Sequence, residues 1–280
     1  MRIATSRVAE TGPAAAGPVP FPPVAAPLIG IRDLSKTYRT KAGETPTLSS
    51  VSLDVRAGEF VAVVGPSGCG KSTLMKLVAG LIPATSGEIS IEGRPVREPP
   101  DDVGIVFQSP VLLAWRSVLG NVMLPVDVRR LDRARYRERA LQLLETAGLK
   151  GFETRYPWQL SGGMQQRAAI CRALVHDPAI LLMDEPFGAL DAMTREHMNV
   201  ELQRIHGATG KTILFITHSI PEAVFLADSV VVMSPRPGRI EAVYDVELPR
   251  PRDLEMMGER GFIALVKRIR GHFAAIGALD

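Results

Sequence analysis

The stretch that decides the fold is Gly65-Pro66-Ser67-Gly68-Cys69-Gly70-Lys71-Ser72-Thr73, which matches the pattern G-x-x-x-x-G-K-[ST]. The apolar run 60–64 before it is typical of a buried parallel strand, and residues 74–79 after it favour a helix. A strand, a glycine loop and a helix in this order aim several backbone N–H groups at one anion. In such a loop Lys71 reaches the β- and γ-phosphates of a nucleotide, and the Ser72 hydroxyl ligates Mg²⁺. The sequence therefore predicts a loop that binds a nucleoside triphosphate.

The composition is that of an ordinary globular chain. Its 280 residues are 46% hydrophobic and 22% charged, enough for one large core or one core with a small subdomain. The formal net charge of +3 gives no electrostatic argument for nucleic acid, and no nucleic-acid partner is expected. The two cysteines are too few for a disulfide framework and favour a reducing, cytosolic compartment. We interpret Cys69 as a small residue tolerated in the loop, not as a nucleophile.

The chain divides into three parts. Residues 1–27 are rich in Ala and Pro, lack an apolar period and are expected to be a disordered leader. Residues 28–250 are expected to form the nucleotide-binding domain, with a helical subdomain at about 109–176 inserted between strands. Residues 251–280 are expected to form an amphipathic helix or tail. Because no stretch approaches the ~18 apolar residues that span a bilayer, we expect the chain to be soluble or associated with a membrane only through a partner.

Two basic segments leave alternatives open. Six arginines between residues 129 and 139 form either a solvated helix face or a contact for anionic lipid headgroups. In the tail, residues 261–273 place apolar side chains on one helical face and Lys267, Arg268 and Arg270 on the other. That apolar face either packs on its own domain or serves a regulatory or membrane-surface role.

Polar residues follow three apolar strands. After the strand 179–183, Asp184 is placed to hold Mg²⁺ through water, and Glu185 to orient an attacking water. Structural acids that cap a neighbouring helix are the alternative. His218 ends the strand 212–217, at the edge where open α/β sheets place ligands, and Gln108 ends the strand 103–107.

Two further positions have a functional and a structural interpretation. Ser161 is a residue type that caps helix N-termini, because its hydroxyl accepts from an N–H group of the first turn. Gly162 and Gly163 leave the first N–H groups of the following helix uncovered. Close packing is the alternative explanation of a Gly-Gly pair at a helix start. Tyr38, between strands expected at 28–34 and 51–55, either stacks on a nucleotide base or is a half-buried strand aromatic.

Taken in order, these motifs resemble those of the ATP-binding cassette family, the ATPase subunits of ABC transporters. The resemblance extends from Leu28 to about Val246, and the segment 160–167 is similar to the signature that separates this family from other P-loop NTPases. It implies an α/β fold in which a P-loop NTPase core sheet carries an antiparallel β subdomain and an inserted helical subdomain.

The resemblance also implies a role for each matching position. Residues 65–73 would cradle the phosphates of ATP and Tyr38 would stack on adenine, which favours the base-stacking interpretation of this tyrosine. The expected catalytic residues are Glu185, His218 and Gln108, and the expected Mg²⁺ ligands are Ser72, Gln108 and Asp184. The residues expected to contact ATP held by the opposite subunit of a homodimer are Ser161, Gly162, Gly163 and Asp191. Because no position departs from the pattern, we expect an active ATPase with ATP and Mg²⁺.

Residues 106–118 and 233–240 resemble the nitrate/sulfonate/taurine group of bacterial importers. This implies a subunit on the cytoplasmic face of the inner membrane, transmembrane permease subunits and a periplasmic or lipid-anchored solute-binding protein. In that group the surface around residues 112–116 receives a permease helix, although packing alone also explains Trp115. The alternatives are a soluble ABC ATPase of repair, translation or assembly, or an importer for another solute such as a thiamine precursor.

Overall fold

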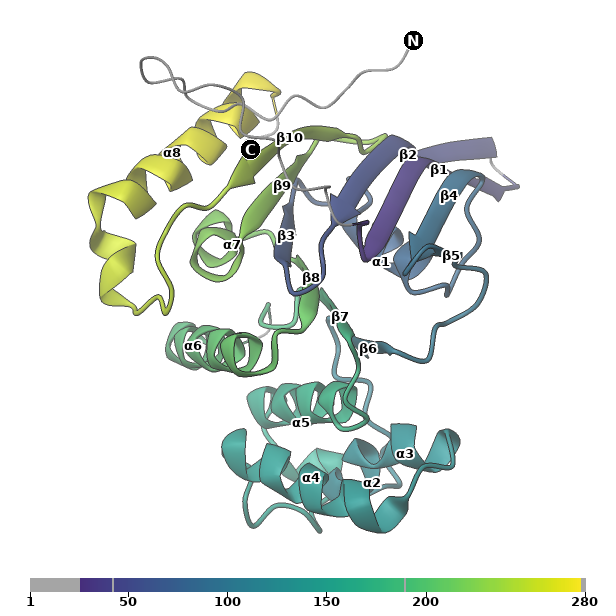
Figure 1. Cartoon of the computed structure of the whole chain (residues 1–280), viewed down its shortest axis with the longest axis vertical. Coiled ribbons are helices and arrows are strands. Elements are labelled where there is room, and N and C mark those ends of the chain that lie inside the picture. The colour runs from purple at the N-terminus through teal and green to yellow at the C-terminus, as the bar shows by residue number, and fades with distance from the viewer. Residues whose placement is uncertain (1–25, 42, 189, 278–280) are drawn as a thin grey trace.

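The computed structural model of the protein describes residues 26–41, 43–188 and 190–277. The expected leader, residues 1–27, lies outside these ranges except for its last two residues. Figure 1 shows three groups of elements: a central sheet, an antiparallel sheet beside it, and a group of helices at the lower end of the view.

The central sheet has six described strands and is mainly parallel. In spatial order they are β10 (Ile240–Asp245), β9 (Ser229–Met233), β3 (Phe60–Val64), β8 (Thr212–Ile216), β7 (Ile180–Asp184) and β6 (Val103–Val106). Of these strands only β10 pairs antiparallel, with β9. Because the parallel strands end at one edge, the segments that follow β3, β6, β7 and β8 meet there.

Alternate residues of the central strands enter two separate hydrophobic cores. In β3, Val61 and Val63 belong to the core that contains α1 (Lys71–Val78), whereas Ala62 and Val64 belong to the other core. That second core takes side chains from α5 (Gly162–Leu174), α6 (Ala192–Thr209), α7 (Ile220–Leu226) and α8 (Arg260–Ala275). Since successive side chains of a strand point to opposite faces, α1 and α5 cover opposite faces of the sheet.

The antiparallel sheet lies on the α1 side. Its strands in order are β2 (Gly43–Val55), β1 (Ile29–Thr40), β4 (Ser86–Ile91) and β5 (Arg94–Pro95). The expectation that Tyr38 lies between two short strands is wrong, because Tyr38 is inside β1 and pairs with Thr45 of β2. The sequence pattern missed this part of the hairpin because its side chains are largely exposed, so backbone pairing continues without apolar alternation.

The helical group between β6 and β7 has its own hydrophobic core. It consists of α2 (Val118–Val122), α3 (Leu124–Val128), α4 (Arg133–Thr146), a 3₁₀ turn (Pro157–Gln159) and α5. The Asp132 carboxylate caps α4, accepting from the N–H groups of Ala134 and Arg135. Gly148, at a φ of 66°, follows the end of this helix. Arg133, Arg135 and Arg137 of the basic run are exposed on α4, as a solvated helix face requires.

A 3₁₀ turn (Glu255–Gly258) leads into α8, which packs on the central domain. Phe262, Ile269 and Phe273 are buried in the second core, and Leu265 and Val266 pack against it. The apolar face predicted for the tail is therefore covered by its own domain. Among the described helices, none combines the length and apolar character that crossing a bilayer requires.

Candidate nucleotide-binding and hydrolysis site

The phosphate-binding pattern connects β3 to α1, as predicted. Gly70 precedes α1 with a φ of 110°, a backbone conformation that only glycine adopts without strain. Lys71 is 5% exposed, and its Nζ donates to the carbonyl oxygens of Gly65 and Pro66 at 2.8 and 3.0 Å. The ammonium is therefore held by its own loop, where the first N–H groups of α1 also lie. This arrangement suits the phosphate groups of a nucleotide.

The turn between β9 and β10, residues 234–239, packs against the phosphate loop. The Gly238 N–H donates to the carbonyl oxygen of Thr47 at 2.9 Å, and the Gly238 carbonyl accepts from the Ser49 N–H at 3.0 Å. A Cβ added to Gly238 would lie 2.1 Å from the carbonyl oxygen of Cys69. Gly238 is thus confined between β2 and the phosphate loop, and no larger residue fits there without displacing backbone.

The same turn makes a polar contact with the phosphate loop. Arg236 Nε donates to the carbonyl oxygen of Gly68 at 3.2 Å. Burial raises the pKa of the Cys69 thiol, although the nearby charges of Lys71 and Arg236 lower it. A protonated, buried thiol supports the interpretation of Cys69 as a packing residue rather than a nucleophile. The sequence marked residues 233–240 only by resemblance to an importer group, and their contact with the phosphate loop was missed.

Replacing Gly238 by alanine is expected to lower thermal stability and to weaken ATP binding together. The added Cβ must displace the Cys69 backbone, and overpacking of this kind costs about 1–3 kcal/mol. Differential scanning fluorimetry and nucleotide titration measure the two effects. The control is Gly271→Ala within α8, where a Cβ meets no atom within 4 Å. A Gly238→Ala protein with wild-type melting temperature and ATP affinity would contradict the packing argument.

Ser72, in the first turn of α1, contacts Asp184 at the end of β7. The Ser72 Oγ donates to Asp184 Oδ1 at 3.0 Å, and Asp184 is 5% exposed at the end of β7. Burial raises the pKa of this carboxyl, as does the neighbouring Glu185, while the Ser72 hydrogen bond lowers it. A divalent cation would compensate a carboxylate buried in this way, and oxygen atoms of these two kinds are ligands that Mg²⁺ accepts. The residues present therefore fit a Mg²⁺ ion.

Glu185 lies between the two other predicted catalytic side chains. Its Oε2 accepts from Gln108 Nε2 at 3.5 Å and lies 3.1 Å from His218 Nδ1. These three residues come from the ends of β7, β6 and β8, so the shared edge of the sheet brings them together. Within the described ranges, Glu185 Oε1 accepts no hydrogen bond. One carboxylate oxygen is thus fixed by neighbours, and the other is available to a reactant.

The signature residues lie at the start of α5. Ser161 caps this helix, accepting from the Met164 N–H at 3.3 Å. Ser161 and Gly162 are exposed, Gly163 is half-buried, and a Cβ on Gly162 would meet no atom within 4 Å. Close packing therefore does not explain Gly162. Helices α5 and α1 cover opposite faces of the sheet. The exposed start of α5 therefore does not lie against the phosphate loop of its own chain.

Two remaining predicted residues are exposed. Asp191 caps α6, with its Oδ1 accepting from the Thr194 N–H at 3.0 Å and its Oδ2 from the Thr194 hydroxyl at 2.7 Å. These hydrogen bonds lower the pKa of the Asp191 carboxyl. Tyr38 is 39% exposed on β1, and the Lys36 ammonium lies 5.2 Å from its ring centroid. An exposed ring face is what stacking on a base requires.

Comparison with known proteins identifies the family. The family profile described as "ABC transporter" matches residues 48–188. The taurine import ATP-binding protein TauB of Rhizobium johnstonii is 50% identical over 224 residues, covering 80% of this chain and 86% of TauB. An uncharacterized ABC transporter ATP-binding protein of Methanocaldococcus jannaschii is 45% identical over 223 residues, covering 80% of this chain and 84% of that protein.

A solved structure gives the same result. The dimeric ATP-binding cassette MJ0796, in a post-hydrolysis state bound to ADP and Pi, superimposes with a TM-score of 0.71 at 33% identity. The match covers 79% of this chain and 100% of that one. A phosphate loop, two strand-end carboxylates and an exposed signature helix on this fold define an ATP-binding cassette ATPase. The chain belongs to the ABC transporter family and is an ATP-hydrolysing subunit. The predicted family, fold class and ATPase activity are confirmed.

Proposed function

We propose that this chain hydrolyses ATP to power the import of a small sulfonate of the taurine type through a separate permease. The observation that carries the hydrolytic step is the placement of Glu185, between Gln108 and His218 at the sheet edge beside the phosphate loop. The solute class is supported by the relatives, since several proteins named TauB are 45–50% identical over most of the chain.

Glu185 would act as the base in hydrolysis. Gln108 and His218 both engage its Oε2, which fixes the orientation of the carboxylate. Its Oε1 is left to accept the proton of the water that attacks the γ-phosphate. Ser72, Asp184 and Gln108 would hold Mg²⁺, which when bound neutralises charge on the phosphates. Lys71 and the N–H groups of residues 65–73 would bind the same phosphates from the opposite side.

A complete site would need two chains. Ser161 and Gly162 are exposed at the start of α5, and α5 lies across the sheet from α1. A head-to-tail homodimer would place this helix start against the phosphates bound by the partner. The dimeric state of the related MJ0796 cassette supports this assembly. Loss of the γ-phosphate would remove the group that both chains bind, and the dimer would open.

The permease would dock on exposed aromatic residues of the helical group. Trp115 and Trp158 are 74% and 66% exposed, and Trp158 stacks on Tyr156 with ring centroids 4.7 Å apart. The Val118 N–H donates to the carbonyl oxygen of Arg155 at 2.7 Å, which places the two aromatic segments side by side. Exposure of this size argues against packing as the explanation of Trp115. Docking here would hold the subunit at the cytoplasmic face of the inner membrane.

Reconstitution with the partner permease tests the proposal. With the permease and its solute-binding protein in proteoliposomes, we expect ATP-dependent uptake of labelled taurine, competed by other small sulfonates. Trp158→Ala is expected to reduce uptake while leaving the ATPase rate of the isolated subunit unchanged. Glu241→Gln, at an exposed position of β10, serves as control.

Uptake of a thiamine precursor instead of taurine would overturn the solute class. Co-purification with ribosomes or DNA and without a permease would overturn the transport role.

A further inference from the structure

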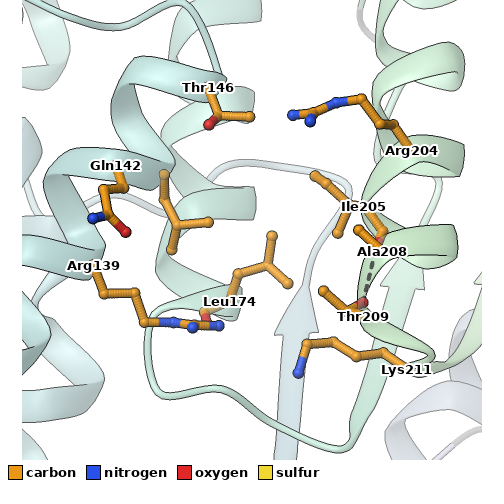
Figure 2. Close-up of a pocket in the computed structure, with 10 residues that line it drawn as sticks. Arg139, Gln142, Thr146, Leu174, Arg204, Ile205, Ala208, Thr209 and Lys211 are labelled. Atoms are coloured by element: carbon orange, nitrogen blue, oxygen red, sulfur yellow. Dashed lines mark hydrogen bonds between the residues drawn. The ribbon is translucent and has the colours of Figure 1, made fainter.

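A second pocket lies between the helical group and the central domain. It has a volume of about 240 Å³, and we call it the α4–α6 pocket. Figure 2 shows side chains from α4 and α6 facing each other across it, with Lys211 at its base. Its lining includes Arg139, Leu174, Arg204, Ile205, Ala208 and Lys211. Ligand sites with an apolar floor and a few convergent polar groups have this character.

The charges around the α4–α6 pocket favour an anion. Three of its lining residues are cationic and, within the described part of the chain, none is acidic. Arg139 and Lys211 share one carboxylate, that of Asp177, at 2.7 and 2.8 Å. Arg204 pairs with Glu201 at 2.7 Å. The three cationic side chains are thus paired with two carboxylates, those of Asp177 and Glu201. One positive charge at the pocket is therefore left without a carboxylate of its own.

One donor in the pocket wall has no acceptor. The Nε of Arg139 is buried and makes no hydrogen bond within the described residues. A buried donor without a partner is uncommon in folded proteins, and here it adds to the positive character of the pocket wall. The carbonyl oxygen of Leu174 lies 3.5 Å from Arg139 Nη2, and that of Ile205 accepts from the Thr209 hydroxyl.

The α4–α6 pocket lies at the opposite edge of the sheet from the hydrolysis site. Lys211 directly precedes β8, whereas His218 follows its carboxyl end. A strand of five residues spans about 17 Å at ~3.3 Å per residue, so the two sites do not overlap. A ligand in this pocket and a nucleotide on the phosphate loop therefore bind at the same time.

We propose that the α4–α6 pocket binds a small organic anion. Its apolar body would lie on Leu174 and Ile205, and its carboxylate or sulfonate group would accept hydrogen bonds from Arg204. In Figure 2 the guanidinium groups of Arg139 and Arg204 extend toward the space between the two helices. Leu174 and Ile205 face each other in the middle. Since α4 belongs to the helical core and α6 to the core of the sheet, the bound anion contacts both parts of the molecule.

Calorimetric titration of the full chain with benzenesulfonate tests this site. The protein is first saturated with Mg·ADP, so that the phosphate loop is occupied. We expect saturable one-to-one binding and a rise in melting temperature, because the anion binds only the folded chain. Benzenesulfonamide, which has the same shape without the charge, and sulfate, which lacks the apolar body, are expected to bind at least ~10-fold more weakly.

Two variants locate the binding. Arg204→Gln removes an exposed cation and is expected to weaken benzenesulfonate binding about tenfold, the loss typical of a charged hydrogen bond. Ala208→Leu is expected to abolish binding by filling the pocket from an exposed helical position. The control Arg270→Gln, exposed on α8, changes the net charge equally and should bind as wild type. Binding that both variants leave unchanged would overturn the proposal. So would the absence of binding up to about 10 mM, beyond the affinity range of a specific site.

Discussion

Replacement of Glu185 by glutamine is expected to lower ATP turnover by ~10²-fold or more while leaving ATP affinity close to wild type, as the loss of a catalytic base predicts. Glutamine keeps the shape of the side chain but its amide does not take a proton. The phosphate loop and the Ser72–Asp184 contact are untouched by the change, so binding should persist. Steady-state phosphate release measures the rate, and titration with a fluorescent nucleotide measures the affinity.

The same substitution is expected to trap a dimer. With ATP bound and not hydrolysed, the γ-phosphate keeps both chains engaged, and size-exclusion chromatography with light scattering should report a doubled mass. Glu241→Gln, on the exposed face of β10, is the matched control and should behave as wild type. Near-normal turnover in Glu185→Gln would remove Glu185 from its proposed role.

The second large effect concerns Gly162. In the Glu185→Gln background, Gly162→Asp is expected to abolish the ATP-induced dimer while each chain still binds ATP. The fold tolerates this change, because a Cβ at Gly162 meets no atom within 4 Å, and an acidic residue is favourable at a helix N-terminus. The chain alone should therefore keep or slightly raise its melting temperature. The new carboxylate would, however, face the γ-phosphate held by the partner and repel it.

Gly261→Asp provides the control for this experiment. Gly261 occupies the second position of α8, and a Cβ there makes only an ordinary contact with Leu248 at 3.5 Å. This variant places the same charge at the start of another helix, so its dimer should form normally. If Gly162→Asp dimerises as fully as Gly261→Asp, the signature helix does not complete a neighbour's site.

The parts of the site that sequence alone predicted are those with local signals. The phosphate loop, Asp184, Glu185 and His218 each follow an apolar strand, and parallel strands that share an edge bring such residues together. The N-cap at Ser161 was predicted for the same reason, since a cap and its helix are adjacent in sequence. The mutual contact of Gln108, Glu185 and His218 is consistent with these placements.

The parts that sequence reasoning missed depend on long-range contacts without a periodic pattern. Gly238 packs against the backbone of Cys69, which is far from it in the sequence. No local pattern around Gly238 predicts this contact. The full length of the β1–β2 hairpin was missed because its exposed end lacks apolar alternation. The stack of Trp158 on Tyr156 was missed because two aromatic residues so close in sequence have no helical or strand period.

Helix α5 is shared between two cores, and this has a mechanical consequence. Its Ala168 and Cys171 pack with the helical group, whereas Ile170 and Leu174 pack with the central sheet. At 13 residues it is a rod of about 20 Å that carries Gly162 at its first turn. Gln166 on this rod donates to the carbonyl oxygen of Phe107 at 3.2 Å. A displacement of the helical group would therefore move the start of α5 at Gly162 and, through Gln166, the residue next to Gln108. The same helix thus connects the helical group to Gly162 and to the segment that carries Gln108.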